Sequence, residues 1–195
     1  AVAGMILDYR AFDTLGESHV LFTALLVVTI MLRLDSRNQR REYEDYYQVR
    51  FERYYPTEKD PVMRLTGVVH GCLILLFGVY ILVNGHLGPG GGFSGGAIIG
   101  AGLILYAIAF GFGRLERLLN LRTFRVICLV ALCFYSVSKC YSFFCGANGL
   151  HTIFSPGTPG RILSAGLILP LNVAVGIVVA CTMYGLYSIF QRGRI

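Results

Sequence analysis

Charged residues are scarce in this sequence. Asp, Glu, Lys and Arg make up 14% of the 195 residues, whereas hydrophobic residues make up 55%. Soluble globular domains carry about a quarter charged residues. The charges cluster in 33–64, 114–125 and the two ends of the chain. Between them lie apolar runs of about 20 residues, the length at which a helix crosses a bilayer. The sequence therefore predicts an all-α, polytopic membrane protein rather than a soluble domain.

Motifs for metal, redox or covalent chemistry are also missing. The six Cys residues lie mostly within apolar runs and form no CxxC pair. We interpret them as small hydrophobic residues, although a disulfide between Cys140 and Cys145 stays open. The sequence offers no nucleophile–base pair and no cofactor fingerprint. We therefore expect no metal, no cofactor and no catalytic activity in this chain itself.

Two further classes are excluded by where the charges lie. The net charge of +6 is compatible with nucleic-acid binding, but most Arg residues flank apolar runs, as membrane topology alone requires. A cleavable signal peptide is not expected either. The first residues lack a basic segment and an adequate apolar core, because Asp8 and Arg10 follow seven residues that are mostly apolar.

Apolar runs predict five membrane-spanning helices, at about 15–32, 65–83, 94–112, 124–144 and 162–190. Pro170 removes a backbone hydrogen bond, so we expect the fifth helix to be kinked or broken there, with Asn172 able to satisfy the freed groups. Fourteen of the 17 Lys and Arg residues fall on one side of such a chain, against Arg10 and Arg161 on the other. Because basic residues accumulate in cytoplasmic segments, we predict an outer N-terminus and an inner C-terminus.

The spans divide the chain into three parts. Residues 1–34 contain the first span, 35–61 form a linker, and 62–195 form a domain of four spans. The linker mixes acidic and basic residues with aromatic residues at helical spacing, namely Tyr43, Tyr47, Phe51 and either Tyr54 or Tyr55. This pattern predicts a cytoplasmic helix lying on the membrane or on a partner subunit, and Pro61 is expected to open the next span.

A glycine-rich segment precedes the third span. It reads Gly88-Pro89-Gly90-Gly91-Gly92-Phe93-Ser94-Gly95-Gly96, after Asn84-Gly85-His86. A phosphate loop is disfavoured because no Gly-Lys-Ser/Thr follows and no strand precedes. Close helix packing is favoured instead: Gly96 and Gly100 form a GxxxG pair, as do Gly67 and Gly71, so the second and third spans are expected to pack closely. Pro89 would stiffen the turn and His86 would orient it, with Phe93 as its one bulky residue.

Ionisable residues at membrane depth are costly, so each is a candidate for function. Lys139 is either buried or extended to the outer interface. We interpret His70 as a neutral, hydrogen-bonded residue of the core rather than as part of a proton relay. Asp13 and Glu17 are four residues apart and can share one helix face as an acidic mouth for cations, although Asp13 or Thr14 could equally cap the helix.

Two stretches together resemble a known family. Residues 8–17, DYRAFDTLGE, resemble a motif near the C-terminus of the large Mrp antiporter subunit, which also occurs in small MbhE-type subunits of membrane-bound hydrogenases. Residues 84–111, NGHLGPGGGFSGGAIIGAGLILYAIAFG, resemble the signature of the MnhB/MrpB (MbhF-type) subunit, and residues 156–180 resemble the closing helix of that same family.

The resemblance implies a subunit of a cation/proton antiporter module in a prokaryotic cytoplasmic membrane. Its implied partners are other antiporter subunits, hydrogenase or other redox subunits and membrane lipid, with Na⁺ and H⁺ as the transported ions. It further implies that Asp13 and Glu17 lie near the sodium path. It also implies that the glycine motif packs against other subunits, and that Pro89 and Phe93 give the motif its shape.

The chain departs from the family pattern at its start. Family members usually have a full helix before the acidic motif, whereas seven residues precede it here. We expect that helix to belong to another polypeptide or to have been lost by rearrangement. The union of two units that are often separate favours a hydrogenase-type or otherwise unusual complex over a standard Mrp operon.

Two hypotheses follow for function. In the first, the chain shapes an ion path with Asp13 and Glu17, and with Lys139 and His70 as further candidates. In the second, the chain is a structural subunit that packs between antiporter and redox modules without touching ions. An independent membrane enzyme is disfavoured by the absence of catalytic motifs.

Overall fold

Five long helices dominate the computed structural model, which describes residues 11–38, 61–85, 90–111, 121–149 and 167–192. The helices are α2 (Ala11–Asn38), α4 (Pro61–Asn84), α5 (Gly92–Phe110), α7 (Leu121–Ala147) and α8 (Ile168–Arg192). Each is long and apolar enough to cross a membrane. The predicted all-α class and the five spans are therefore confirmed. Most of the predicted linker helix, from residue 39 to 60, lies outside the described residues.

Two prolines lie in the first turns of helices. Pro61 is the first residue of α4, as the sequence predicts. Pro170 is the third residue of α8, which continues without interruption to Arg192. The first-turn amides of a helix have no partner within it, so proline is tolerated there. The described part of the fifth span is therefore one helix that begins near Pro170, where we expected a kink or break. Residues 162–166 of the predicted span lie outside the described residues.

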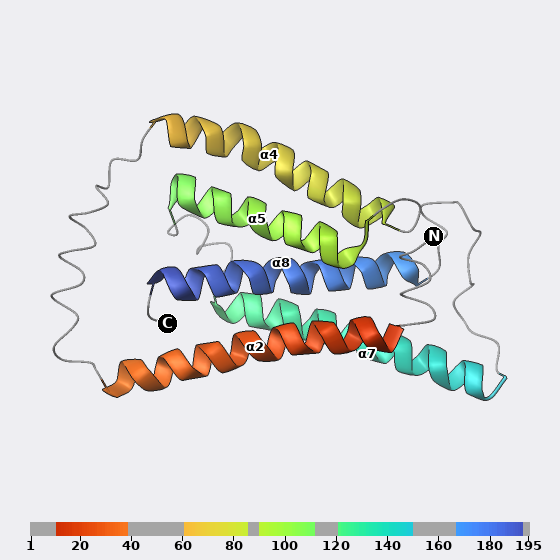
Figure 1. The fold of residues 1–195 in the computed structure, drawn as a ribbon. Helices are drawn as coiled ribbons and strands as arrows, with labels where there is room; N and C mark the ends of the chain where they lie inside the picture. Colours follow the sequence, from red (N-terminus) through yellow and green to blue (C-terminus); the bar gives the residue numbers. More distant parts are fainter. Residues whose placement is uncertain (1–10, 39–60, 86–89, 112–120, 150–166, 193–195) are drawn as a thin grey trace.

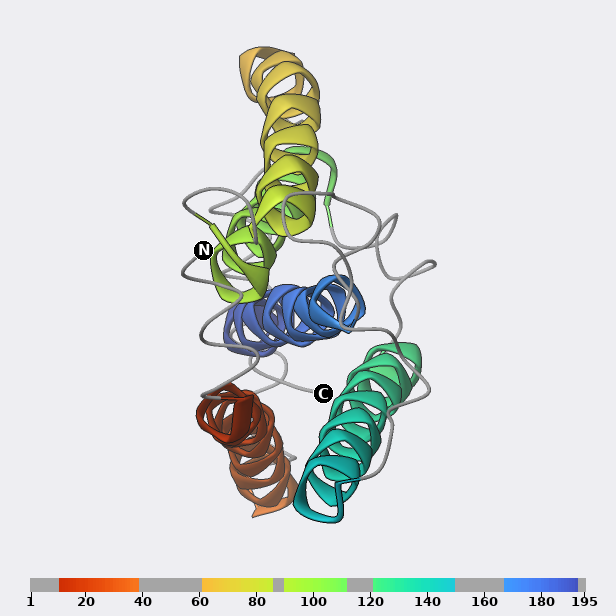
Figure 2. The same ribbon diagram turned by 90° about the vertical axis from the view of Figure 1, so that its right-hand side faces the viewer.

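Helix α8 lies at the centre of the bundle. Figures 1 and 2 show α4, α5 and α8 as a row, with α2 and α7 side by side against the opposite side of α8. About two thirds of its spanning segment is buried (67%), compared with 17–33% in the other four helices. Successive helices run in opposite directions, so the first residues of α2, α5 and α8 meet at one end of the bundle (Figure 1). The acidic motif and the glycine motif are thereby brought to the same end.

Glycines on two faces of α5 let it pack between α8 and α4. On one face, a Cβ added to Gly96 would lie 2.5 Å from the Gly176 carbonyl oxygen of α8. Gly92 and Gly100, one turn away on either side, also meet α8. On the other face, a Cβ on Gly95 would lie 2.9 Å from the Leu82 nitrogen of α4. Only residues without a side chain allow backbones to approach this closely.

The predicted partner of the Gly96–Gly100 pair is therefore wrong. Close packing of α4 on α5 is present, but it uses Gly95 and Gly102 from α5 together with Gly67 and Gly78 from α4. Gly71 has nothing within 4 Å of an added Cβ. The reason is helical geometry: residues 92, 96 and 100 share one face, and residues 95 and 102 lie on another. The sequence spacing identified the close packing of the second and third spans, but not the glycines that make it or the contact of Gly96 and Gly100 with α8.

Candidate functional site

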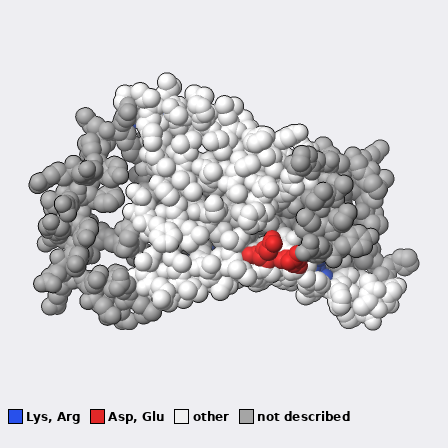
Figure 3. All heavy atoms as spheres, in the orientation of Figure 1, with Lys and Arg blue, Asp and Glu red and all other residues white. Residues whose placement is uncertain are grey.

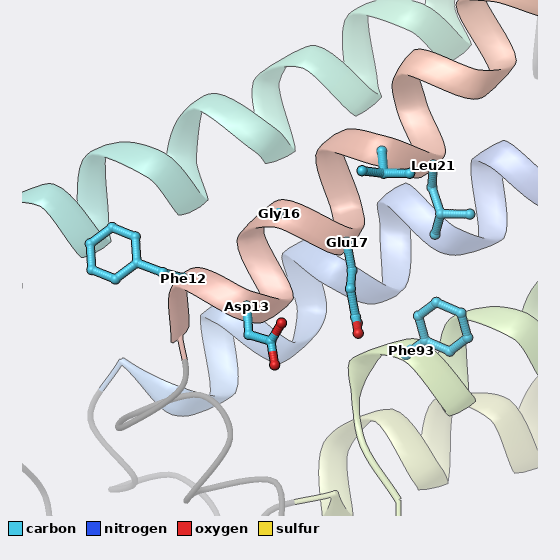
Figure 4. Close-up of a pocket in the computed structure, with 7 residues that line it drawn as sticks. Phe12, Asp13, Gly16, Glu17, Leu21 and Phe93 are labelled. Carbon is cyan, nitrogen blue, oxygen red and sulfur yellow. The ribbon is translucent and has the colours of Figure 1, made fainter.

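An acidic groove lies beside the first turns of α2. Asp13, Gly16, Glu17 and Val20 recur at helical spacing and therefore share one face of this helix. Figure 4 shows the Asp13 and Glu17 side chains pointing into the space between α2 and the beginning of α5, with α8 behind them. The predicted shared face of the two carboxylates is thus present.

The groove encloses about 620 Å³ and is lined mainly by α2. Its lining residues are Phe12, Asp13, Gly16, Glu17, Val20, Leu21 and, from α5, Phe93. Nothing lies within 4 Å of a Cβ added at Gly16, so this position leaves the groove wide. Both carboxylates are exposed. Figure 3 shows them as an acidic patch on a face whose other described residues are almost entirely uncharged. A wide, acidic, partly apolar groove is suited to attracting a cation.

The glycine motif contributes its one bulky side chain to this groove. The ring of Phe93 is 50% exposed and lies opposite Glu17 in Figure 4. The described glycines of the motif are occupied by contacts within the chain: Gly92 and Gly96 meet α8, Gly90 meets Ile81, and Gly95 meets α4. Among the described residues of the motif, Phe93 and Ser94 are the two whose side chains are exposed within this chain. His86 and Pro89 lie outside the described residues.

Other faces of α2 anchor the acidic face in position. Thr14 forms a side-chain hydrogen bond with Tyr135, which is only 2% exposed on α7. The rings of Phe12 and Phe143 meet edge to face, with centroids 5.9 Å apart. These contacts turn one side of α2 towards α7 and leave the carboxylates on the open side.

A side chain of another helix caps the first turn of α5. The Gly92 amide donates a hydrogen bond to the Asn172 Oδ1 of α8, at 3.0 Å. Gly91 has no side chain to cap its own helix. Asn172 therefore satisfies one of the free amides at the beginning of α5 and joins this helix to α8. The expectation that it would repair a break at Pro170 is wrong, because Pro170 needs no such repair in a first turn.

Lys139 is buried on α7, at 7% exposure. The sequence left burial and extension to the interface open, and within this subunit the side chain is buried. Lys139 follows Tyr135 by four residues, so the two share a face of α7. Because Tyr135 bonds to Thr14, this face is turned towards the beginning of α2. A buried lysine close to an acidic groove can influence how the groove binds ions.

His70 lies away from the groove. It is exposed on α4, the helix at the edge of the bundle, and its Nδ1 lies 3.3 Å from the Thr66 carbonyl oxygen. The expected hydrogen bond is present, but His70 is not in the core of this chain, because α4 buries only a narrow face and His70 is not on it. The described residues contain no cluster of three or more His, Cys, Asp or Glu side chains suited to a metal ion. Cys140 and Cys145 are both free thiols.

Five helices that are long and apolar enough to cross a membrane, with an acidic groove at one end of the bundle, are the features of a polytopic membrane protein. The chain belongs to the family described as a domain related to the MnhB subunit of Na⁺/H⁺ antiporter, whose model matches residues 62–185. This match confirms the family that the glycine motif suggested. It covers α4, α5 and α7 and most of α8, but not α2.

Relatives extend the likeness to nearly the whole chain. An uncharacterized protein of Methanocaldococcus jannaschii, MJ1307, is 33% identical over an alignment of 189 positions, which covers 90% of this chain and 71% of the relative. The Staphylococcus aureus protein named as antiporter subunit mnhB2 is 32% identical over 89 residues, which are 46% of this chain and 62% of that one.

Two solved complexes contain chains with this fold. One belongs to the membrane-bound sulfane sulfur reductase (MBS), an archaeal respiratory membrane complex, with a TM-score of 0.70, 29% identity, and coverage of 96% of this chain and 75% of that one. The other belongs to the Mrp complex from Dietzia sp. DQ12-45-1b, with a TM-score of 0.67 and 24% identity, over 99% of this chain and 20% of that one. The second likeness concerns the fold alone. The coverage of 96% means that the MBS match includes the α2 region.

Proposed function

We propose that this chain is a non-catalytic subunit of an antiporter module within a respiratory membrane complex, where Asp13 and Glu17 line part of a path for Na⁺ or H⁺. The observation that carries the proposal is the acidic groove: two carboxylates on one face of a membrane-spanning helix, exposed within the subunit and facing the glycine motif. Carboxylates within a spanning segment face water, ions or partner groups rather than lipid tails. The family match and the similar chain of the MBS complex support the assembly.

Glu17 is the residue on which the test depends. It lies one turn deeper than Asp13, about 9 Å along α2 from Ala11 at the standard helical rise. Among the described residues, no hydrogen bond or ion pair of Glu17 is found, so its carboxylate is available to a passing cation. Phe93 closes the opposite side of the groove. Lys139 would tune the local potential from within the bundle, whereas His70 lies too far from the groove to share this path.

The experiment compares three variants of the complete complex reconstituted in proteoliposomes. Glu17→Gln removes the charge at nearly constant shape, and we expect cation-dependent pH-gradient formation to fall at least about tenfold, which corresponds to a loss of about 1.4 kcal/mol in the interaction with the ion. Glu17→Asp keeps the charge and should retain a large part of the activity. His19→Gln changes an exposed residue of α2 that does not line the groove, and should leave transport unchanged.

A purely structural subunit is the second candidate, and the glycine contacts of α5 favour it. These contacts hold α5 between α4 and α8, and Asn172 adds a hydrogen bond between α5 and α8. If the chain only holds neighbouring modules together, Glu17→Gln will leave transport intact while Gly96→Leu abolishes assembly. Intact transport in a fully assembled Glu17→Gln complex would therefore overturn the ion path and favour this alternative.

A further inference from the structure

Helix α4 presents two neighbouring exposed stripes of different chemistry. Its buried residues, Gly67, Gly71, Gly78 and Leu82, form a narrow face, and the helix packs chiefly on α5. The first stripe, which we term the aliphatic stripe, consists of Val62, Leu65, Val69, Cys72, Leu76 and Val79. The second, which we term the His70 stripe, consists of Met63, Thr66, His70, Leu73, Phe77 and Tyr80.

Both stripes repeat with the alternating three- and four-residue spacing of a helix–helix seam, so spacing does not separate them. Their composition does. The aliphatic stripe has no strongly polar group and is suited to lipid. The His70 stripe carries a hydroxyl, an imidazole and a phenol among its apolar side chains, and every member is exposed within this subunit. Polar side chains in spanning helices face protein or water rather than lipid tails.

The depth of His70 makes lipid an unsuitable neighbour. His70 follows Pro61 by nine residues, about 14 Å along a helix about 36 Å long, which places it well within a hydrocarbon layer about 30 Å thick. Lys and Arg can reach an interface from such a depth by extending a long side chain, but His has none. One ring nitrogen faces the Thr66 carbonyl oxygen of the same helix, so the other ring nitrogen is the one that needs a polar group at this depth.

The hydrogen bond of His70 indicates what that group offers. A backbone carbonyl only accepts, so the Nδ1 facing the Thr66 oxygen carries the proton. In a neutral ring, Nε2 then holds a lone pair and accepts a hydrogen bond from outside. We propose that the His70 stripe is the docking seam for a membrane-spanning helix of another subunit, which places a hydrogen-bond donor at the depth of His70. This inference rests on the proposed function only in requiring a multisubunit complex.

The test places a photoreactive benzophenone residue at Phe77 or at Leu76 in the full chain within its native complex. The two positions are adjacent in sequence, so they lie at nearly the same depth, and they point about 100° apart around the helix, one in each stripe. We expect position 77 to cross-link to a spanning segment of another subunit, identified by mass spectrometry of the purified complex, at least ten times more than position 76. Lipid adducts alone at position 77, or adducts to a second copy of this chain, would overturn the docking seam.

A second pair of variants tests the hydrogen bond. His70→Leu should reduce recovery of the cross-linked subunit about three- to twenty-fold, the range for one interhelical hydrogen bond in a membrane. His70→Gln keeps an acceptor in a similar place and should restore most of that recovery. Equal recovery from both variants would show that this hydrogen bond does not contribute to docking at the His70 stripe. Because Glu17 lies on α2, failure of the ion-path test leaves the cross-linking result unchanged, and the reverse also holds.

Discussion

Asn172 joins two helices through a single side-chain hydrogen bond, and its other polar atom lacks a partner among the described residues. Its Oδ1 accepts from the Gly92 amide, while its Nδ2 is buried without a partner there. The side chain is 2% exposed. A buried amide without a partner is costly. The hydrogen bond that caps α5 offsets part of this cost. Its neighbours in the sequence are apolar, so Asn172 itself was the one feature of this segment that could have suggested a hydrogen bond between α5 and α8.

Replacing Asn172 should weaken the bundle. Asn172→Leu leaves the Gly92 amide buried without its acceptor, so we expect the free energy of unfolding to fall by about 1–3 kcal/mol. Denaturant titration of the purified chain in detergent micelles measures this change. Thr182→Val is the matched control on α8: its buried hydroxyl bonds only to carbonyls of its own helix, and its loss should cost under about 1 kcal/mol. Equal costs would contradict the capping role.

Two ionisable residues near the same end of the bundle differ in burial. Glu17 is exposed in the groove, and Lys139 is buried. In a chain whose exposed Cys72, Cys133 and Cys140 are replaced by Ala, we expect Glu17→Cys to react with a water-soluble maleimide roughly tenfold faster than Lys139→Cys. Similar labelling rates for the isolated chain in micelles would mean that Lys139 reaches the interface after all.

At the scale of elements, α5 depends on glycine where it crosses α8. A Cβ at Gly96 would lie 2.5 Å from the Gly176 oxygen and 2.9 Å from the Gly176 Cα, so both backbones would have to separate. Gly96→Ala should therefore lower the free energy of unfolding by about 1–3 kcal/mol. Gly71→Ala is the control: nothing lies within 4 Å of its added Cβ, so the gain in helix propensity, about 0.5–1 kcal/mol, should leave stability unchanged or raised.

The helix boundaries could be predicted closely because they depend on local composition. The structure begins α4 at Pro61 and ends α5 at Phe110, within a few residues of the predicted bounds. The role of Pro170 could not be predicted. The apolar run extends on both sides of it, so composition alone does not reveal that α8 begins at Ile168.

At the scale of the whole molecule, the alternating directions of the five helices place the beginning of α2 and the end of α8 at opposite ends of the bundle (Figure 1). The count of basic residues assigns these ends to the two sides of the membrane. We expect green fluorescent protein fused after Arg192 to fluoresce in the cytoplasm, and alkaline phosphatase fused after Gly149 to be active outside. Phosphatase activity at Arg192 would reverse the topology.

The sequence by itself determined the number of spans, their predicted orientation and the family. These properties depend on local composition, on charge counts between apolar runs, and on a glycine-rich motif that is recognisable without a structure. The shared face of Asp13 and Glu17 also followed from their spacing. Only the tertiary structure decided which helix each glycine face meets, that Lys139 is buried, that His70 faces outward, and that Asn172 caps α5. Each of these depends on the rotation of one helix against its neighbours, which the packing of distant segments around α8 controls and hydropathy does not record.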